Sequence, residues 1–332
     1  MKKPIVAITI GKKYYSRMIS EEGIKILESF ADVRHTGTEN PADKDEMKRL
    51  LEGADACITS WEVAPLDAEI MAAAADLKAV VHMGGSVKRL VSDELFEKGV
   101  KVFGASPVLA ETVAETALGF MIMGMKKGWE IAAVVKEGGW RDCDCWPPRE
   151  LRGKTVGIVG ASQVGRHVIK LLKHFNVTIL VYDPYISKED EQLLNVRSVN
   201  LTELAEKSDV ISLHAPVNDK TKQMLNSDIF NVMKDNALIV NTARGALIDE
   251  PALIKELSSG RFNAVLDVSD PEPPAVDSPL RKLANVTLFP HFAGCIEDCS
   301  DMSLRAVEEL RRFFSGEEAL YEITREMFDR IS

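Results

Sequence analysis

Short apolar runs rich in β-branched residues alternate with amphipathic stretches along almost the whole chain, and this alternation constrains the fold most. A first series of buried strands is expected in PIVAITI, ADACITS, LKAVVHM and VKVFG. A second series is expected in KTVGIVG, VTILVYD, SDVISLHAP, NALIVNTARG, FNAVLDVSD and NVTLFPH. Helices such as ISEEGIKILESF and DKDEMKRLLEG lie between the strands. Alternating strands and helices predict parallel sheets covered by helices on both faces.

Two separate domains are expected, because 332 residues are too many for one compact core. A long helix predicted over residues 108–136 and the glycine- and proline-rich segment GGWRDCDCWPPRELRG separate the two series. A charged amphipathic helix over residues 301–315 is expected to close the chain. The sequence therefore predicts an α/β protein with two doubly wound parallel-sheet domains.

The net charge of −10 argues against nucleic acid as a partner. The apolar run near the N-terminus is too short for a signal peptide, and the best membrane candidate, ALGFMIMGM, stops at Lys126. We therefore expect a cytoplasmic protein without a membrane partner. The methionines of GFMIMGM are expected to pack between helices or subunits.

Five cysteines in a chain of this length do not suggest a disulfide framework. A zinc site built from Cys143, Cys145, Cys295 and Cys299 is conceivable, but the C-x-C spacing is tight and the two pairs lie far apart in the sequence. Free thiols are the favoured interpretation, and we expect no metal.

Polar or glycine residues follow each strand of the second series, where ligands of open parallel sheets bind. The first strand ends in Gly160-Ala-Ser162-Gln163-Val164-Gly165, a G-x-G-x-x-G pattern in which serine replaces the second glycine. The second strand ends in Asp183, near the spacing of about 20 residues expected for a carboxylate that binds ribose hydroxyls. The remaining strand ends are His214-Ala215-Pro216, Asn241-Thr242-Ala243-Arg244, Asp267 and Pro290-His291. Six such ends in one domain predict a dinucleotide site.

The segments VGIVGASQVGRHV, LIVNTARGALIDEPAL, LDVSDPEPP, SPLRKLANVTLFPH and LAETVAE together resemble the D-isomer-specific 2-hydroxyacid dehydrogenase family. The resemblance is strong in the second series and only in outline in the first. It implies a Rossmann-type NAD-binding domain, residues 105–294, inserted into a flavodoxin-like substrate domain, residues 1–104 and 295–332. It also implies that the long helix from Val108 is an inter-domain and dimer-forming helix, so that the protein is a homodimer.

The resemblance implies that Arg244, Glu272 and His291 are catalytic. An imidazole can exchange the proton of a 2-hydroxyl group, a neighbouring carboxylate would orient the ring and favour its protonated form, and a guanidinium can hold a substrate carboxylate. The expected NAD contacts are Gly160, Ser162, Gln163, Val164, Gly165, Asp183, His214, Ala215, Pro216, Thr221, Thr242, Ala243, Arg244, Asp267 and His291. Asp183 would repel the 2′-phosphate of NADP, and no Arg or Lys follows it until Lys188, so NAD is expected over NADP.

Several of these residues also allow a purely structural interpretation. Arg244 and Glu272 could be solvated loop residues, and His291 could be a histidine satisfied by its surroundings. Asp183 could cap a helix or a turn before Pro184, and Asp267 could be structural. The order of the motifs at strand ends favours the functional interpretation.

The loop after LKAVVHM departs from the family pattern. Met83, Gly84 and Gly85 are expected to bind substrate, with backbone N–H groups offered to a carboxylate. Lys88 and Arg89 stand where the family has acidic residues; they could suit a substrate with a second negative group, although solvated positions are the favoured interpretation. The expected reaction interconverts a small 2-keto acid and the D-2-hydroxy acid, with glyoxylate, hydroxypyruvate or a phosphoglycerate-like acid as substrate. The alternative is an NAD(H)-sensing, corepressor-like scaffold with little turnover.

Overall fold

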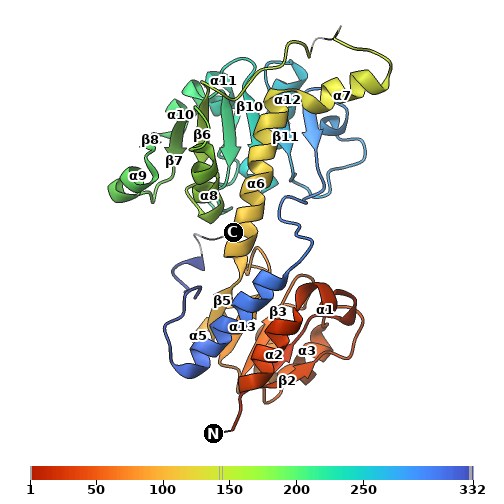
Figure 1. Ribbon diagram of the computed structural model, residues 1–332, viewed down its shortest axis with the longest axis vertical. Helices are drawn as coiled ribbons and strands as arrows, with labels where there is room; N and C mark the ends of the chain where they lie inside the picture. The colour runs from red at the N-terminus through yellow and green to blue at the C-terminus, as the bar shows by residue number, and fades with distance from the viewer. Residues whose placement is uncertain (1, 142, 144, 329–330, 332) are drawn as a thin grey trace. The chain divides into compact units, whose positions relative to one another are not determined.

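The computed structural model of the chain describes residues 2–141, 143, 145–328 and 331. The chain forms two compact units: unit 1 comprises Met1–Leu109 and Cys295–Ser332, and unit 2 comprises Ala110–Gly294. The first boundary therefore lies inside a helix, a few residues beyond the position at 104 that the sequence suggests. Both units are parallel α/β sandwiches, so the predicted fold class is confirmed (Figure 1).

Unit 1 is built on a parallel sheet with the strand order β2-β1-β3-β4-β5. This is the order of flavodoxin-like folds, in which the order reverses between the first and third strands. The strands are β1 (Ile5–Ile8), β2 (Asp32–His35), β3 (Ala56–Thr59), β4 (Ala79–His82) and β5 (Lys101–Gly104). The helices are α1 (Lys12–Met18), α2 (Glu21–Phe30), α3 (Lys44–Leu51), α4 (Ala68–Ala73), α5 (Asp93–Glu97) and α13 (Ser300–Ser315).

Local sequence signals explain where several of these helices begin. Ser20, Asp43 and Asp67 each accept the backbone N–H of the residue three positions later, which satisfies a free donor of the first helical turn. Strand β2 was not expected, because the edge sequence DVRH is partly exposed and has no apolar run.

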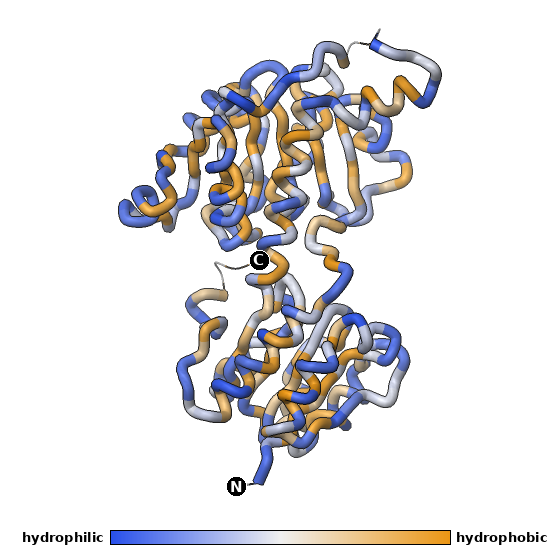
Figure 2. Tube along the Cα trace, viewed as in Figure 1, coloured by the Kyte–Doolittle hydropathy of each residue, from blue (hydrophilic) through white to orange (hydrophobic). Residues whose placement is uncertain are grey.

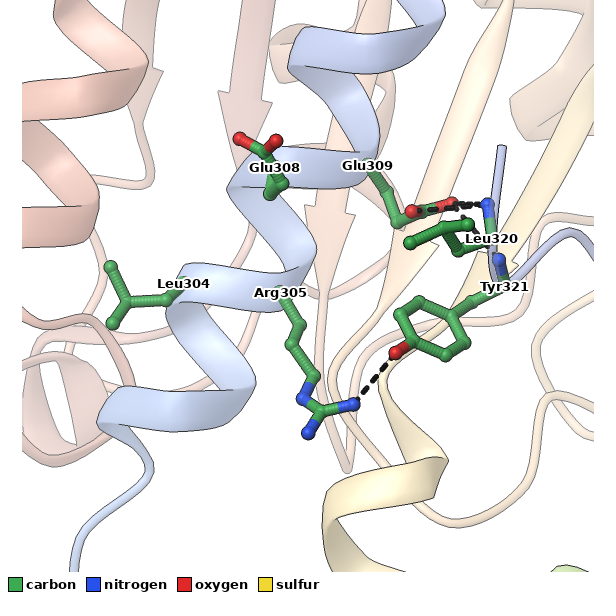
Figure 3. A pocket seen from close by; sticks show the side chains of 6 residues that line it. All are labelled: Leu304, Arg305, Glu308, Glu309, Leu320 and Tyr321. Carbon is green, nitrogen blue, oxygen red and sulfur yellow. Dashed lines mark hydrogen bonds between the residues drawn. The ribbon is translucent and has the colours of Figure 1, made fainter. Parts of the chain in front are cut away.

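The C-terminal tail belongs to unit 1, where it is held on α13 and on the edge of the sheet (Figure 3). The buried carboxylate of Glu309 accepts the backbone N–H groups of Leu320 and Tyr321, and Arg305 donates to the hydroxyl of Tyr321 over 2.8 Å. The tail then pairs with β5, where the N–H of Gly104 donates to the carbonyl of Tyr321.

Unit 2 is built on a parallel sheet with the strand order β12-β11-β10-β9-β6-β7-β8. In order of appearance this is the Rossmann arrangement, with one further strand beyond the sixth. The strands are β6 (Thr155–Val159), β7 (Thr178–Tyr182), β8 (Arg197–Ser198), β9 (Val210–Leu213), β10 (Leu238–Asn241), β11 (Asn263–Leu266) and β12 (Val286–Leu288). The helices are α6 (Ser106–Met125), α7 (Gly128–Lys136), α8 (Gln163–Leu172), α9 (Lys188–Leu194), α10 (Leu201–Lys207), α11 (Ser227–Val232) and α12 (Glu250–Ser258), with short 3₁₀ turns η1 (Gly245–Leu247) and η2 (Pro279–Arg281).

The single helix predicted over residues 108–136 is wrong, because the structure has two helices there. Lys127 adopts a left-handed conformation with φ of 48°, which ends α6 and starts α7 in a new direction. The irregular segment that follows, residues 138–153, includes positions 142 and 144, which lie outside the described residues.

Helix α6 is long and apolar enough, by length and composition, to cross a membrane, although it contains Glu111 and Glu115. A core helix passes the same test, and 44% of its most apolar window is buried. Phe120 stacks on Phe289 at 4.7 Å, and Met121 and Met125 are buried in the core of unit 2, which agrees with the packing role expected for the methionines.

The expectation of free thiols holds for part of the cysteines only. Cys143 and Cys145 form a disulfide, so free thiols at these two positions were the wrong interpretation. Cys57, Cys295 and Cys299 are free, and burial raises the pKa of the Cys57 thiol to about 12. Among the described residues no three metal-ligating side chains come together, so the zinc alternative finds no support there.

Candidate active site

The turn between β6 and α8 brings two backbone segments so close that glycine is required. Gly160 has a φ of 97°, and a Cβ there would lie 2.6 Å from the backbone nitrogen of Ala215. A Cβ on Gly165 would lie 2.1 Å from the carbonyl oxygen of Gly160. The two glycines that the pattern retains are thus those that the backbone needs, and they bring the N-terminus of α8 to the carboxyl edge of the sheet.

Ser162, which replaces the middle glycine, begins α8. Its backbone is extended, and its hydroxyl oxygen accepts the N–H of Gly165 over 3.3 Å, so the side chain caps the helix that Gln163 and Val164 start. Since the hydroxyl accepts this bond, its own proton stays available for an acceptor such as a phosphate oxygen.

Asp183, at the end of β7, fastens two loops. One carboxylate oxygen accepts the N–H of Ala161 over 2.7 Å, and the other accepts the N–H of Tyr185 over 2.8 Å. The structural role considered for this residue is therefore real. A carboxylate has about four acceptor positions, so these two bonds leave capacity for ribose hydroxyls.

The carboxyl ends of β9 and β10 carry buried polar atoms that the protein does not satisfy. Among the described residues, Nδ1 of His214 and Oγ1 of Thr242 are buried without a hydrogen-bond partner. The Nε2 atom of His214 lies 2.9 Å from the hydroxyl of Ser212, and burial lowers the pKa of the ring to about 3, so it is neutral. In the same region Thr221 donates its hydroxyl proton to the carbonyl of Pro216 over 2.6 Å and so closes its own loop. Buried polar atoms normally have partners, so unpaired ones beside a glycine turn fit a dinucleotide site.

Arg244 follows β10 in a turn that a buried asparagine shapes. The side chain of Asn241 donates to the carbonyl of Arg244 over 2.9 Å and accepts the N–H of Ala243 over 3.0 Å. A Cβ on Gly245 would lie 2.0 Å from the backbone of Ser269, so this turn packs directly against the loop after β11. Sequence reasoning gave Asn241 no role; the signal was a polar residue at the end of a fully apolar strand.

Asp267, at the end of β11, holds the loop that carries the predicted catalytic histidine. Its two carboxylate oxygens accept the N–H groups of Phe292 and Ala293, each over 2.9 Å, and its carbonyl accepts the N–H of His291 over 2.8 Å. Asp267 is 1% exposed. These bonds fix His291 at a φ of 55°, a conformation that is uncommon outside glycine and that clusters at functional sites.

Two of the predicted catalytic residues, His291 and Glu272, are in direct contact. The Nδ1 atom of His291 lies 2.6 Å from Oε1 of Glu272. The side chains are 44% and 42% exposed, so solvent screening keeps their contribution to stability small, and the pair serves orientation instead. The bond fixes the ring and directs Nε2 away from Glu272.

Arg244, Glu272 and His291 follow three neighbouring strands, β10, β11 and β12, at the carboxyl edge of one parallel sheet. Residues 118–293 match the NAD-binding domain of the D-isomer-specific 2-hydroxyacid dehydrogenases. A glyoxylate reductase of Thermofilum pendens is 33% identical over 317 residues, which are 92% of this chain and 92% of that protein. The chain belongs to the D-isomer-specific 2-hydroxyacid dehydrogenase family. It is an NAD-dependent enzyme of that class, as the sequence resemblance implied.

Two further comparisons define how far the likeness extends. A D-3-phosphoglycerate dehydrogenase of Methanocaldococcus jannaschii is 34% identical over 303 residues, which cover 90% of this chain but 56% of that protein. The chain therefore spans about half the length of that relative. The crystal structure of D-mandelate dehydrogenase from Rhodotorula graminis has a TM-score of 0.85 at 23% identity and covers 98% of each chain, which shows that the two share a fold.

In this dehydrogenase the predicted substrate loop of unit 1 follows β4. Met83 is buried, Gly85 is exposed, and a Cβ on Gly84 would lie 2.3 Å from Nε2 of His82. The ring of His82 therefore packs directly against Gly84. Its Nδ1 lies 3.0 Å from the hydroxyl of Thr59, and burial lowers the pKa of the ring to about 4.

Lys88 and Arg89 begin the turn that follows this loop, and Arg89 is exposed. Sequence reasoning missed His82, although a histidine ending a fully buried strand was a usable signal.

Proposed function

We propose that this enzyme interconverts a small 2-keto acid and the corresponding D-2-hydroxy acid, with Arg244, Glu272 and His291 as the catalytic residues. The observation that carries this assignment is the 2.6 Å contact between Glu272 and His291, on a histidine held in a left-handed conformation by buried Asp267. Residues held in an unfavourable backbone conformation cluster at functional sites, and a positioned imidazole is suited to proton transfer.

The side chains then divide the chemistry. NADH, when bound, supplies the hydride. His291 donates the proton from Nε2 to the oxygen of the keto group during reduction and accepts it back during oxidation, while Glu272 holds the opposite side of the ring. Arg244 binds the substrate carboxylate through its planar guanidinium.

We also propose the residues that contact the cofactor. Gly160, Ser162 and Gly165 would surround the pyrophosphate at the N-terminus of α8, and Asp183 would accept the ribose hydroxyls. The buried and unpaired Oγ1 of Thr242 would meet a polar group of the cofactor. We expect NAD to be preferred over NADP, because the carboxylate of Asp183 would repel a 2′-phosphate.

Glyoxylate or hydroxypyruvate is the substrate that we propose. The glyoxylate reductase of T. pendens and a hydroxypyruvate reductase of Thermotoga maritima are each 33% identical to this chain, over 92% and 82% of it. A phosphoglycerate-like acid is the alternative substrate, because the D-3-phosphoglycerate dehydrogenase of M. jannaschii is 34% identical. Purified protein mixed with NADH and a panel of glyoxylate, hydroxypyruvate, pyruvate, phosphohydroxypyruvate and branched-chain keto acids should show loss of the reduced nicotinamide absorbance. NADH binding without turnover on any of these acids would instead favour the sensor or corepressor alternative.

We expect His291→Ala to lower turnover by about 10²–10⁴-fold, which is the usual contribution of a positioned acid–base group. NADH affinity measured by calorimetry should be retained, because the ring is not needed to hold the dinucleotide. A variant that keeps near-wild-type turnover on the best substrate would refute the assignment of His291.

We also propose that the protein is a homodimer through α7. This helix reads GWEIAAVVK, and none of its residues is buried, although most are apolar (Figure 2). Val135 on α7 and Trp140 just after it are 43% and 66% exposed. An apolar helix face of this kind is typical of a surface that a partner covers. Light scattering on the protein as it elutes from a size-exclusion column measures the oligomeric state, and we expect the mass of two chains.

A further inference from the structure

An arginine that sequence reasoning did not consider lies at the adenosine end of the proposed cofactor site. Arg166 directly follows Gly165 in α8, and its Nε donates to the carbonyl of Ala161 over 3.0 Å. One terminal nitrogen of the same guanidinium donates to Oδ1 of Asp190 over 2.7 Å. The side chains of Arg166 and Asp190 are 38% and 26% exposed, so the pair is partly shielded from water.

Asp190 is itself held in place. It lies in the first turn of α9, where it and Ser187 form a capping box: the hydroxyl of Ser187 accepts the N–H of Asp190, and the carboxylate of Asp190 accepts the N–H of Ser187. The guanidinium of Arg166 is the main reason that the pKa of Asp190 lies at about 2. Asp190 is therefore charged at any physiological pH.

Ala161 connects this pair to the residue that is expected to choose the cofactor. Its carbonyl accepts from Arg166, and its N–H donates to Asp183 over 2.7 Å. The guanidinium therefore lies close to Asp183, and the charges of Asp190 and Asp183 both favour its protonated form. Two carboxylates and one guanidinium leave a net negative charge at this place. The neighbouring Lys188 and Glu191 compensate each other in a 2.6 Å ion pair.

We propose that Asp190 is a second determinant of the preference for NADH over NADPH, and that it acts as a positioning residue through Arg166. While Asp190 holds the guanidinium, its charge is neutralised and the remaining charge of Asp183 repels a 2′-phosphate. Without the negative charge of Asp190, the guanidinium balances Asp183 and can turn its terminal N–H groups toward a phosphate, which guanidinium groups bind well. The proposal rests on the proposed function, because it takes Asp183 as the ribose contact.

The experiment compares the dissociation constants of NADH and NADPH by calorimetry, together with kcat/KM for both cofactors on glyoxylate. Asp190→Asn keeps the size and an oxygen acceptor for the capping box while removing the charge. We expect the affinity of NADPH relative to NADH to rise about tenfold, which is the scale of one charge-assisted hydrogen bond. The double variant Asp190→Asn with Arg166→Gln should return to the wild-type ratio, because the guanidinium is then absent.

Glu191→Gln is the matched control. It removes one negative charge from the same helix and breaks the ion pair with Lys188, while the amide oxygen can still accept the N–H of Ser198, so its cofactor ratio should stay at the wild-type value. An unchanged ratio in Asp190→Asn would overturn the proposal, as would an equal rise in Glu191→Gln or a rise that persists without Arg166.

The calorimetric ratio also separates this proposal from the proposed function. If NADH and NADPH bind but no keto acid is reduced, the catalytic assignment fails while the comparison of the two dissociation constants still stands. If Asp183→Asn leaves the ratio unchanged, Asp183 is not the ribose contact. A change in Asp190→Asn together with no change in Asp183→Asn would therefore overturn the mechanism proposed here without touching the catalytic residues.

Discussion

Replacing Ser162 by Ala should have two separable consequences, because the structure gives the hydroxyl two tasks. Its oxygen accepts the N–H of Gly165 over 3.3 Å and so caps α8. Its proton is available to a phosphate oxygen at the N-terminus of the same helix. Alanine keeps the Cβ that crowds the turn and loses both interactions.

The size of each effect follows from this geometry. Loss of a serine N-cap costs about 0.5–2 kcal/mol, and because the bond is long we expect about 0.5–1 kcal/mol of folding stability. Loss of a hydrogen bond to the pyrophosphate should weaken NADH binding by about 1 kcal/mol, or roughly fivefold in the dissociation constant. The melting temperature of unit 2 should fall by a few degrees.

Three further substitutions at the same position assign the two effects. Ser162→Thr keeps the cap and the hydroxyl and should change little. Ser162→Gly should cost only a few tenths of a kcal/mol in capping and change NADH affinity less than alanine does, since relief of crowding offsets the lost bond. Ser162→Asp keeps a good cap but places a charge against the pyrophosphate, so stability should be retained while NADH affinity falls.

Calorimetric titration with NADH and thermal unfolding without cofactor are the two assays. If Ser162→Ala binds NADH as tightly as the wild type while melting at a lower temperature, the hydroxyl caps the helix and does not contact the phosphate. If Ser162→Asp binds NADH normally, the pyrophosphate does not lie at this helix terminus, and the argument for the whole glycine turn fails.

Two other predictions follow from buried groups. Asp267→Asn should lower kcat by about 10²-fold, because an amide cannot accept both N–H groups of the His291 loop and a 1 Å displacement of an acid–base group has about that effect; a folded variant with wild-type kcat would contradict this. The free energy of unfolding should fall with acid below pH 6.5, because burial lowers the pKa of His82 from 6.5 to about 4 and that of His214 to about 3, so the unfolded chain takes up these protons first. Each ring contributes up to about 1.4 kcal/mol per pH unit to this loss. Denaturant titrations at several pH values give the free energy of unfolding as a function of pH, and this free energy should change less steeply with pH in His82→Gln than in the wild type.

Elements with strong local signals could be predicted from the amino-acid sequence. The apolar strands β6, β7, β9, β10 and β11 appear where their β-branched runs predict them. Gly160 and Gly165 were identified because only glycine tolerates the conformation or the close backbone approach required there. The resemblance to the family predicts that Arg244, Glu272 and His291 are catalytic, and the structure brings Glu272 and His291 into direct contact.

Other features were decided by contacts between residues far apart in the chain. Edge strands β2 and β8 have no apolar alternation, because they need no buried face of their own, and their backbone pairing with a neighbouring strand creates them. The break between α6 and α7 lies at Lys127, directly before Gly128, and the left-handed conformation is adopted by the lysine and not by the glycine. A pattern of apolar residues that continues past this point does not reveal such a break.

The roles of the buried and partly buried polar residues were the hardest to predict from the sequence. Asp267 was predicted as a cofactor contact, and its side chain accepts backbone N–H groups of the loop that carries His291. Asn241 had no predicted role, and its side chain bonds backbone N–H and carbonyl groups of the Arg244 turn. Arg166 and Asp190 lie 24 positions apart in the chain, and their ion pair joins α8 to α9. The partner of a hydrogen-bonding side chain is chosen by distance in space, and the strand order that sets this distance is a property of the folded sheet, which no local pattern specifies.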